Sequence, residues 1–156
     1  MDILDDEILN FWKLLSENNV KYIIVGGFAS NLHGFQRTTG DIDLWIKDTT
    51  ENRKKFRKVL QLCGIGDFEN IETTQLIPGW TVLYFPSGFE LDVMTSLKGF
   101  PSESFDACFA ISPIAEIENI PVKFLHINKL IEAKKASARP KDLLDVIELE
   151  KIRDQK

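Results

Sequence analysis

The amino-acid sequence predicts a mixed α/β (α+β) fold in which helices pack on a largely antiparallel β-sheet. Amphipathic helical patterns open and close the chain, and short apolar runs rich in β-branched residues lie between them. The order is helix, strand, helix, strand, helix, several strands and two helices, which is typical of a sheet covered by helices. A chain of 156 residues has the size of one ordinary domain. We therefore expect a single domain at 1–156, with 127–156 as a C-terminal two-helix segment packed on it.

The first part of the chain predicts three helices and two strands. The first helix has acidic residues in its first turn, where the helix dipole favours negative charge. The first strand ends in Gly26-Gly27, a pair suited to a turn, and Thr49 or Thr50 is the expected N-cap of the third helix. In order, we expect a helix at 2–18, a strand at 21–27, a short helix at 28–34, a strand at 41–47 and a helix at 49–64.

The second part predicts two strand pairs followed by two helices. A turn cluster at 86–88 separates the first two apolar runs, and Glu118-Asn119 separates the second two. Pro140 suits the first position of the last helix. Residues 100–108 show no clear pattern. We expect strands at 80–85, 89–94, 110–117 and 120–126, and helices at 127–138 and 140–154.

Composition excludes several broad classes of protein. The 19 lysines and arginines against 24 aspartates and glutamates give a net charge of −5, which argues against a basic surface suited to DNA. No apolar run is long enough for a membrane span, and the two cysteines have no CxxC spacing. We therefore expect a cytoplasmic protein with reduced cysteines and no membrane partner.

Two aspartates, Asp41 and Asp43, lie in an apolar strand, where a buried ionised carboxylate is costly unless it is paired or bound to metal. Alternation along a strand puts both on one face. Asp92 is a third aspartate embedded in a later apolar strand. If Asp92 lies beside them, the three can hold two Mg²⁺ ions. The alternative is that each is a strand-end residue satisfied by backbone donors.

Other polar residues near these aspartates suggest a phosphate site. Gly26 and Gly27 precede a helix, so their N–H groups can receive a phosphate. Ser30 can donate to a phosphate or face solvent. Arg37 can pair with a triphosphate or neutralise an aspartate. Lys134 can project toward a cleft beside the aspartates or lie on a solvated face.

The order of these features resembles a known enzyme superfamily. An apolar strand, Gly26-Gly27, 13 intervening residues, Asp41-Ile42-Asp43 and a later Asp92 resemble the nucleotidyltransferases that share a catalytic core with DNA polymerase beta. The pattern HG-x-x-R-x-T-x-DID at 33–43 is similar to small stand-alone bacterial members, including toxins of abortive-infection and toxin–antitoxin systems. The stretch 129–146 resembles the closing segment of that family.

The resemblance implies a nucleotidyltransferase-like fold and a metal-dependent transfer of a nucleoside monophosphate from an NTP, such as ATP, to an acceptor hydroxyl on RNA, protein or a small molecule. It implies two Mg²⁺ or Mn²⁺ ions and, for a toxin-type enzyme, an antitoxin partner. The alternative is a non-catalytic nucleotide-binding module or a toxin–antitoxin partner subunit with the same fold. The implied metal-binding and catalytic residues are Asp41, Asp43 and Asp92, and the implied nucleotide-binding residues are Gly26, Gly27, Ser30, Arg37, Thr39 and Lys134. The roles of His33, Lys129, Arg139 and Asp142 stay open.

Overall fold

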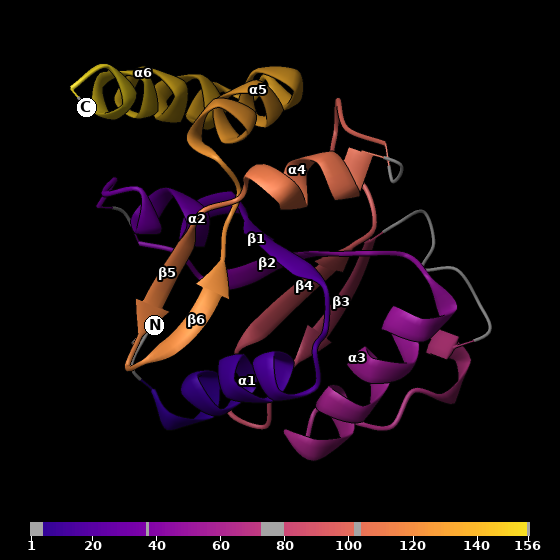
Figure 1. Ribbon diagram of the computed structural model, residues 1–156. Helices are drawn as coiled ribbons and strands as arrows, with labels where there is room; N and C mark the ends of the chain where they lie inside the picture. The colour runs from indigo at the N-terminus through magenta and orange to yellow at the C-terminus, as the bar shows by residue number, and fades with distance from the viewer. Residues whose placement is uncertain (1–4, 37, 73–79, 102–103, 156) are drawn as a thin grey trace.

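The computed structural model describes residues 5–36, 38–72, 80–101 and 104–155. At its centre is a four-stranded sheet with the strand order β1-β2-β4-β3, and a separate hairpin forms β5 and β6 (Figure 1). The strands are β1 (Tyr22–Val25), β2 (Asp41–Ile46), β3 (Trp80–Tyr84), β4 (Glu90–Met94), β5 (Ile114–Ile117) and β6 (Ile120–Lys123). The helices are α1 (Asp6–Glu17), α2 (Gly26–Leu32), α3 (Thr50–Leu62), the 3-10 helix η1 (Glu69–Glu72), α4 (Phe105–Ile111), α5 (Ile127–Ser137) and α6 (Pro140–Asp154).

The predicted fold class is confirmed. Strands β2 and β4 run parallel, whereas the pairs β1–β2, β3–β4 and β5–β6 are antiparallel, so the sheet is mixed and largely antiparallel. Helices α1 and α3 lie on one side of the sheet, and α4, α5 and α6 lie on the other (Figure 1). The parallel pair is the one that brings two distant acidic segments together.

The hydrophobic core lies between the sheet and the helices α1 and α3. Trp12 of α1 stacks on Tyr22 of β1 with 6.2 Å between the ring centroids. Phe11 meets Phe85 edge-on at 5.2 Å, just after β3 ends. These large rings fix one face of the sheet against α1, and the polar side chains of β2 must therefore face the other way.

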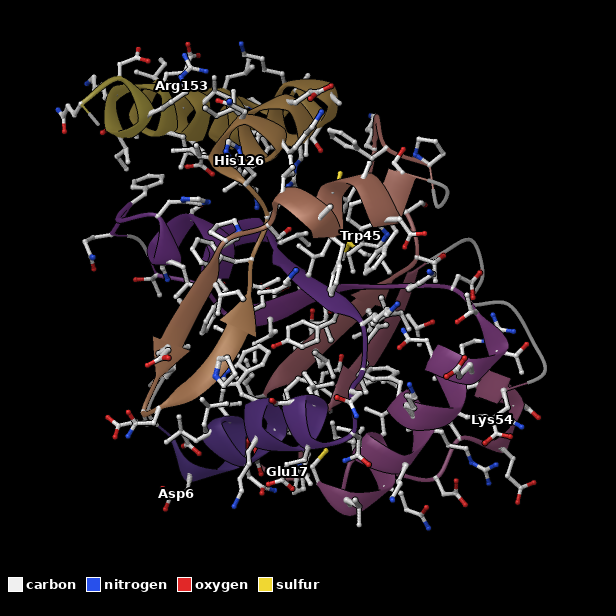
Figure 2. All side chains as sticks on the ribbon, viewed as in Figure 1. Asp6, Glu17, Trp45, Lys54, His126 and Arg153 are labelled. Carbon is white, nitrogen blue, oxygen red and sulfur yellow. The ribbon has the colours of Figure 1, made fainter. Side chains whose placement is uncertain are left out.

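The opposite face is covered in part by α4. Trp45 points from β2 toward α4 (Figure 2), and its ring meets Phe105 edge-on at 5.4 Å. Because side chains alternate along a strand, Asp41 and Asp43 share this face with Trp45, while Ile42 between them is fully buried in the core. The predicted alternation of β2 is thus present.

Strand β5 begins later than the sequence pattern predicted. The expected strand at 110–117 loses its first residues to α4, in which Phe105 and Phe109 lie one helical turn apart and stack at 5.5 Å. In the β5–β6 hairpin, Glu118 and Asn119 have φ values of 49° and 65°. Positive φ at both central residues is the signature of a type I′ turn, so the sequence located this turn correctly.

The C-terminal helices are anchored to the sheet at the start of α5. The N–H of Leu125 donates to the carbonyl of Ile24 in β1 at 2.9 Å, and the carbonyl of Leu125 lies 2.7 Å from Nε2 of His33. Ala138 ends α5 in the left-handed conformation, and Pro140 is the first residue of α6, as the sequence predicted. These contacts hold the α5–α6 pair above α2 and β1.

The sequence also made predictions about membrane-spanning segments and cysteines. Within the described residues, no helix is both long enough and apolar enough to cross a membrane. Cys63 and Cys108 are free thiols, and Cys108 is buried. Cys108 lies in the hydrophobic core, and Cys63 is partly buried against it.

Candidate active site

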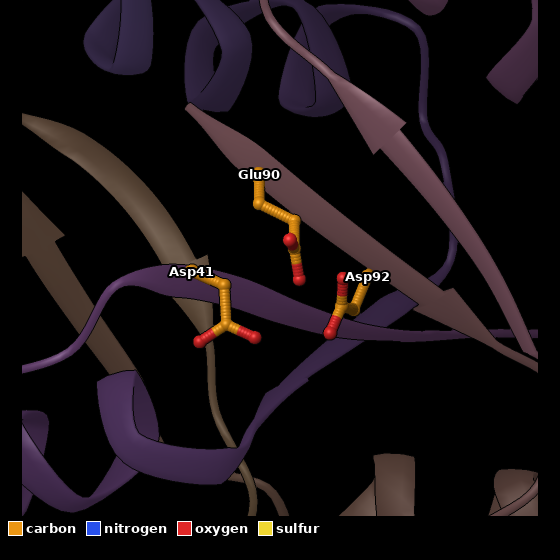
Figure 3. A group of neighbouring side chains, drawn as sticks. All are labelled: Asp41, Glu90 and Asp92. Carbon is orange, nitrogen blue, oxygen red and sulfur yellow. The ribbon is translucent and has the colours of Figure 1, made fainter. Parts of the chain in front are cut away.

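Carboxylates from β2 and β4 converge on the face of the sheet that they share with Trp45. The parallel pairing puts Asp41 opposite Glu90 and Asp43 opposite Asp92, and directly paired residues point to the same face. Oxygens of Asp41, Glu90 and Asp92 lie within 4.8 Å of one another, and the three side chains point toward a common space (Figure 3). The condition that Asp92 lies beside the β2 aspartates is met.

Glu90 was not predicted from the sequence. It lies two residues before Asp92, so the same alternation that joins Asp41 with Asp43 would have placed Glu90 and Asp92 on one face. Glu90 is the first residue of β4 and follows the turn at 86–88. A charged residue at a strand end is common, so the sequence pattern did not distinguish Glu90 as a site residue.

The site is strongly acidic and partly shielded from water. Burial first, and then the charge of Asp41, raise the pKa of Asp43 to about 7. The pKa of Asp92 is raised to about 8, chiefly by burial. Hydrogen bonds with Glu90 and Asp41, which need a proton between the two carboxylates, and the nearby negative charges raise it further. Both carboxylates are therefore costly to ionise without a compensating positive charge.

The donor set fits a divalent cation. Asp92 is 4% exposed, and its Oδ1 has no hydrogen-bond partner among the described residues. Clustered carboxylate oxygens are the ligands that Mg²⁺ and Mn²⁺ prefer. A cation here would satisfy the buried oxygen and remove the repulsion among the acids.

The raised pKa values predict how stability depends on pH. We expect the unfolding free energy of the metal-free protein to fall as pH rises from about 4 to about 8, because the folded-state pKa values of Asp43 and Asp92 lie above the ordinary 3.8. In that range the folded protein holds protons that the unfolded chain has already released, so unfolding becomes easier as these protons are lost. Urea unfolding with a chelator present, repeated across this range, measures the slope.

Addition of Mg²⁺ or Mn²⁺ is the matching control. The cation competes with protons for the same oxygens, so it should restore stability at the alkaline end of the range and have little effect at the acidic end. A flat pH dependence, or equal stabilisation at both ends, would contradict the assigned electrostatics.

Gly26 is required by the position of Asp43. It has a φ of +69°, and a Cβ at this residue would lie 2.0 Å from Oδ2 and 2.9 Å from Cγ of Asp43. No side chain fits between the turn and the carboxylate. The structure thus supplies a packing reason for this glycine, separate from the phosphate contact that the sequence suggested.

Two predicted hydroxyl residues hold the backbone around the carboxylates. Ser30 is fully buried, and its Oγ donates to the carbonyl of Gly26 at 3.3 Å. The Oγ1 of Thr39 donates to the carbonyl of Asp41 at 2.9 Å. Arg37 lies outside the described residues. Ser30 and Thr39 therefore support Gly26 and Asp41 through backbone contacts.

A cavity of about 490 Å³ opens beside Asp43, between the sheet and the α5–α6 pair. Val25, Gly26 and Met94 line its sheet side. Its lining also includes the basic residues Lys98, Lys134 and Arg139. The cavity lining thus includes both the carboxylate of Asp43 and basic side chains, which suits an anionic ligand carrying cations.

The predicted Lys134 is held by α6. It is 8% exposed, and its Nζ lies 2.9 Å from Oδ2 of Asp145 and 4.0 Å from Oδ1 of Asp142. Arg139 donates to both oxygens of Asp142, at 2.6 and 3.2 Å. The charge of Lys134 also acts to lower the pKa of Asp43. Lys134 therefore reaches the site electrostatically while its hydrogen bond goes to α6.

The acidic β2–β4 pair, the glycine turn after β1 and the order of strands define a protein of the nucleotidyltransferase class. The chain belongs to the family described as "Nucleotidyltransferase of unknown function (DUF6036)", which matches residues 4–155. Membership makes it a transferase of that superfamily, as the resemblance implied. No curated protein sequence matches the chain.

Solved structures with this fold include antibiotic-resistance enzymes. The solution structure of the antibiotic-resistance factor ANT(2″)-Ia is 17% identical, with a TM-score of 0.54, over 94% of this chain and 80% of that one. The crystal structure of ANT(2″)-Ia in complex with adenylyl-2″-tobramycin is 17% identical, with a TM-score of 0.54, over 95% and 93%. An antigenic nucleotidyltransferase-like protein from Paracoccidioides brasiliensis is 20% identical, with a TM-score of 0.55, over 92% and 72%. At these identities the likeness establishes the fold.

Proposed function

We propose that this protein transfers a nucleoside monophosphate from an NTP to an acceptor hydroxyl. A bond forms between the acceptor oxygen and the α-phosphorus, and the bond from that phosphorus to the bridging oxygen breaks, releasing pyrophosphate. The observation that supports this is the convergence of carboxylates from β2 and β4, in which Asp43 pairs with Asp92 and oxygens of Asp41, Glu90 and Asp92 lie within 4.8 Å of one another. One buried oxygen of Asp92 has no donor among the described residues. Family membership supports the reaction class.

Asp41, Asp43 and Asp92 would hold two divalent cations, Mg²⁺ or Mn²⁺. When bound, the cations supply charge stabilisation and orientation for an in-line displacement at phosphorus. The chain itself fixes the carboxylates through β2–β4 pairing and through the close contact of Gly26 with Asp43. Asp92, which is buried and lies opposite Asp43, helps to take the proton of the attacking hydroxyl.

The nucleotide would occupy the cavity beside Asp43. Lys98, Lys134 and Arg139 on its lining attract a triphosphate. Gly26 and Gly27 leave the turn after β1 without side chains, so a phosphate can approach the backbone. Three further residues support the site. Ser30 and Thr39 hold the backbone next to the carboxylates, and the role proposed for Arg37 is to pair with the triphosphate.

The acceptor is a hydroxyl on RNA, protein or a small molecule. The ANT(2″)-Ia crystal contains adenylyl-2″-tobramycin, which supports a small molecule among these acceptors. A role as a toxin-type enzyme with an antitoxin partner rests on the resemblance of the HG-x-x-R-x-T-x-DID segment. A non-catalytic nucleotide-binding subunit with the same fold is the competing function.

Labelled nucleotide distinguishes the two functions. Cell extract incubated with the protein, an NTP labelled at the α-phosphate and Mg²⁺ or Mn²⁺ should yield a labelled product that disappears with a chelator. Asp43→Asn should lower product formation at least about 100-fold, since it removes a charge that stabilises the transition state. The matched control is Asp106→Asn, since Asp106 is an exposed aspartate on α4 that pairs with Lys47.

Two outcomes decide against the enzyme. Metal-dependent NTP binding without any labelled product would indicate the non-catalytic module. NTP binding that needs no metal and is unchanged by Asp43→Asn would remove the nucleotide from this site altogether.

A further inference from the structure

The edge strand β3 presents an exposed surface next to the carboxylates. Tyr84 lies opposite Glu90, and Val82 lies opposite Asp92, in the β3–β4 pair, so all four side chains point to the same face. Tyr84 is 57% exposed and Val82 is 43% exposed, whereas Leu83 between them is 9% exposed. A molecule that reaches the carboxylates from this side meets an aromatic ring and an aliphatic side chain.

The carboxylates separate this surface from the cavity. Met94, further along β4 than Asp92, lines the cavity. Glu90 lies at the other end of β4, beside Tyr84. In-line displacement requires the attacking oxygen and the leaving pyrophosphate on opposite sides of the phosphorus. With the triphosphate in the cavity, the acceptor must approach from the side of Tyr84 and Glu90.

The chemistry of this side favours an acceptor rich in hydrogen-bond donors. The segment 80–94, which forms β3, β4 and their turn, contains no lysine or arginine. Glu90 belongs to the same carboxylate cluster as Asp41 and Asp92 and lies at the end of that cluster beside Tyr84. With the three aspartates assigned to the cations, a Glu90 oxygen can accept from hydroxyl or ammonium groups of the acceptor. Its charge opposes the phosphates of an RNA backbone.

We propose that Tyr84 and Glu90 form the acceptor-binding side of the active site, and that the acceptor is a cationic small molecule with a hydroxyl-bearing ring. Tyr84 stacks against the ring, and Val82 extends this apolar contact. Glu90 accepts a hydrogen bond from the acceptor and orients its attacking hydroxyl. This inference rests on the proposed nucleotidyl transfer and adds the acceptor class and the residues that bind it.

Fractionated extract tests the acceptor class. The small molecules that bind a cation exchanger, the total RNA and the total protein are each incubated with the enzyme, Mg²⁺ and α-labelled NTP. We expect label in the cationic small-molecule fraction. Label in RNA or in protein instead leaves nucleotidyl transfer standing and overturns the acceptor assignment, whereas no label in any fraction overturns the proposed function itself.

Substitutions test the acceptor-binding residues. With the labelled fraction as acceptor, Glu90→Gln and Tyr84→Ala should each raise the acceptor KM about tenfold or more, with metal-dependent NTP affinity unchanged. Tyr84→Phe, which keeps the ring, should restore the KM. Glu116→Gln on β5, a strand glutamate outside the site, is the control and should leave both parameters unchanged.

Two results with the same variants would contradict the proposed roles. If Glu90→Gln weakens metal-dependent NTP binding, Glu90 is a cation ligand and its acceptor role is wrong. If Tyr84→Ala lowers kcat without changing the acceptor KM, or if Tyr84→Phe fails to restore it, the stacking role is wrong.

Discussion

Replacement of Asp92 with asparagine is expected to lower nucleotidyl transfer by at least about 100-fold while making the metal-free protein more stable. Asparagine keeps the shape of the side chain but cannot ionise. Asp92 is only 4% exposed, and its negative charge is repelled by those of Asp41 and Asp43. It also offers a donor to the neighbouring carboxylates. We expect a gain of roughly 1 kcal/mol in unfolding free energy above the folded-state pKa of Asp92, because ionisation is costly there.

The pH dependence of that gain separates electrostatics from packing. Below the raised pKa, which is about 8, Asp92 already carries a proton, so the difference between the variant and the wild type should shrink as pH falls. Urea unfolding of both proteins with a chelator measures this difference. A variant that is less stable at every pH, or one that keeps full transfer activity, would contradict the role assigned to Asp92.

Replacement of Gly26 with alanine is expected to damage both stability and catalysis. The residue has a φ of +69°, and the new Cβ would lie 2.0 Å from Oδ2 of Asp43. The left-handed backbone alone costs alanine about 1 kcal/mol, and relief of the clash requires movement of the turn or the carboxylate. We expect a loss of roughly 2 kcal/mol or more in unfolding free energy, together with a strong loss of nucleotidyl transfer.

Two comparisons identify the clash as the cause. Gly34 has a φ of +106°, but nothing lies within 4 Å of a Cβ built there, so Gly34→Ala should lower stability while transfer activity is kept. In an Asp43→Ala background, Gly26→Ala should lose less stability than in the wild type, because the closest atoms are gone. Equal losses in both backgrounds would show that backbone strain alone explains the effect.

The local patterns of the sequence predicted much of the fold. The helical spacing and acidic first turn of α1, the Thr49 N-cap of α3 and Pro140 at the start of α6 are all present. Each of these features depends on residues only a few positions apart, so a local sequence pattern is enough to predict it. The start of β5 was wrong because an apolar segment without polar alternation fits a strand or a short helix equally well, and the ring pair of Phe105 and Phe109 favours the helix.

The candidate site was predicted only in part. Alternation within β2 was enough to put Asp41 and Asp43 on one face. The glycine pair, expected to end the first strand, instead forms the first two residues of α2. Glu90 was missed. Lys134 lines the cavity, but the hydrogen bond from its Nζ to Asp145 of α6 was not foreseen. That partner lies on a different helix, and helical spacing within α5 contains no information about which residues of α6 face it.

The sequence by itself determined which carboxylates share a strand face, where the turn after β1 lies and which enzyme superfamily the chain resembles, because these follow from short-range order along the chain. Only the tertiary structure decided that β4, and not β3, lies beside β2. That adjacency puts Asp92 next to Asp43 and Glu90 next to Asp41, and it leaves Tyr84 exposed at the sheet edge. Strand neighbours separated by more than 40 residues are chosen by packing of the whole core.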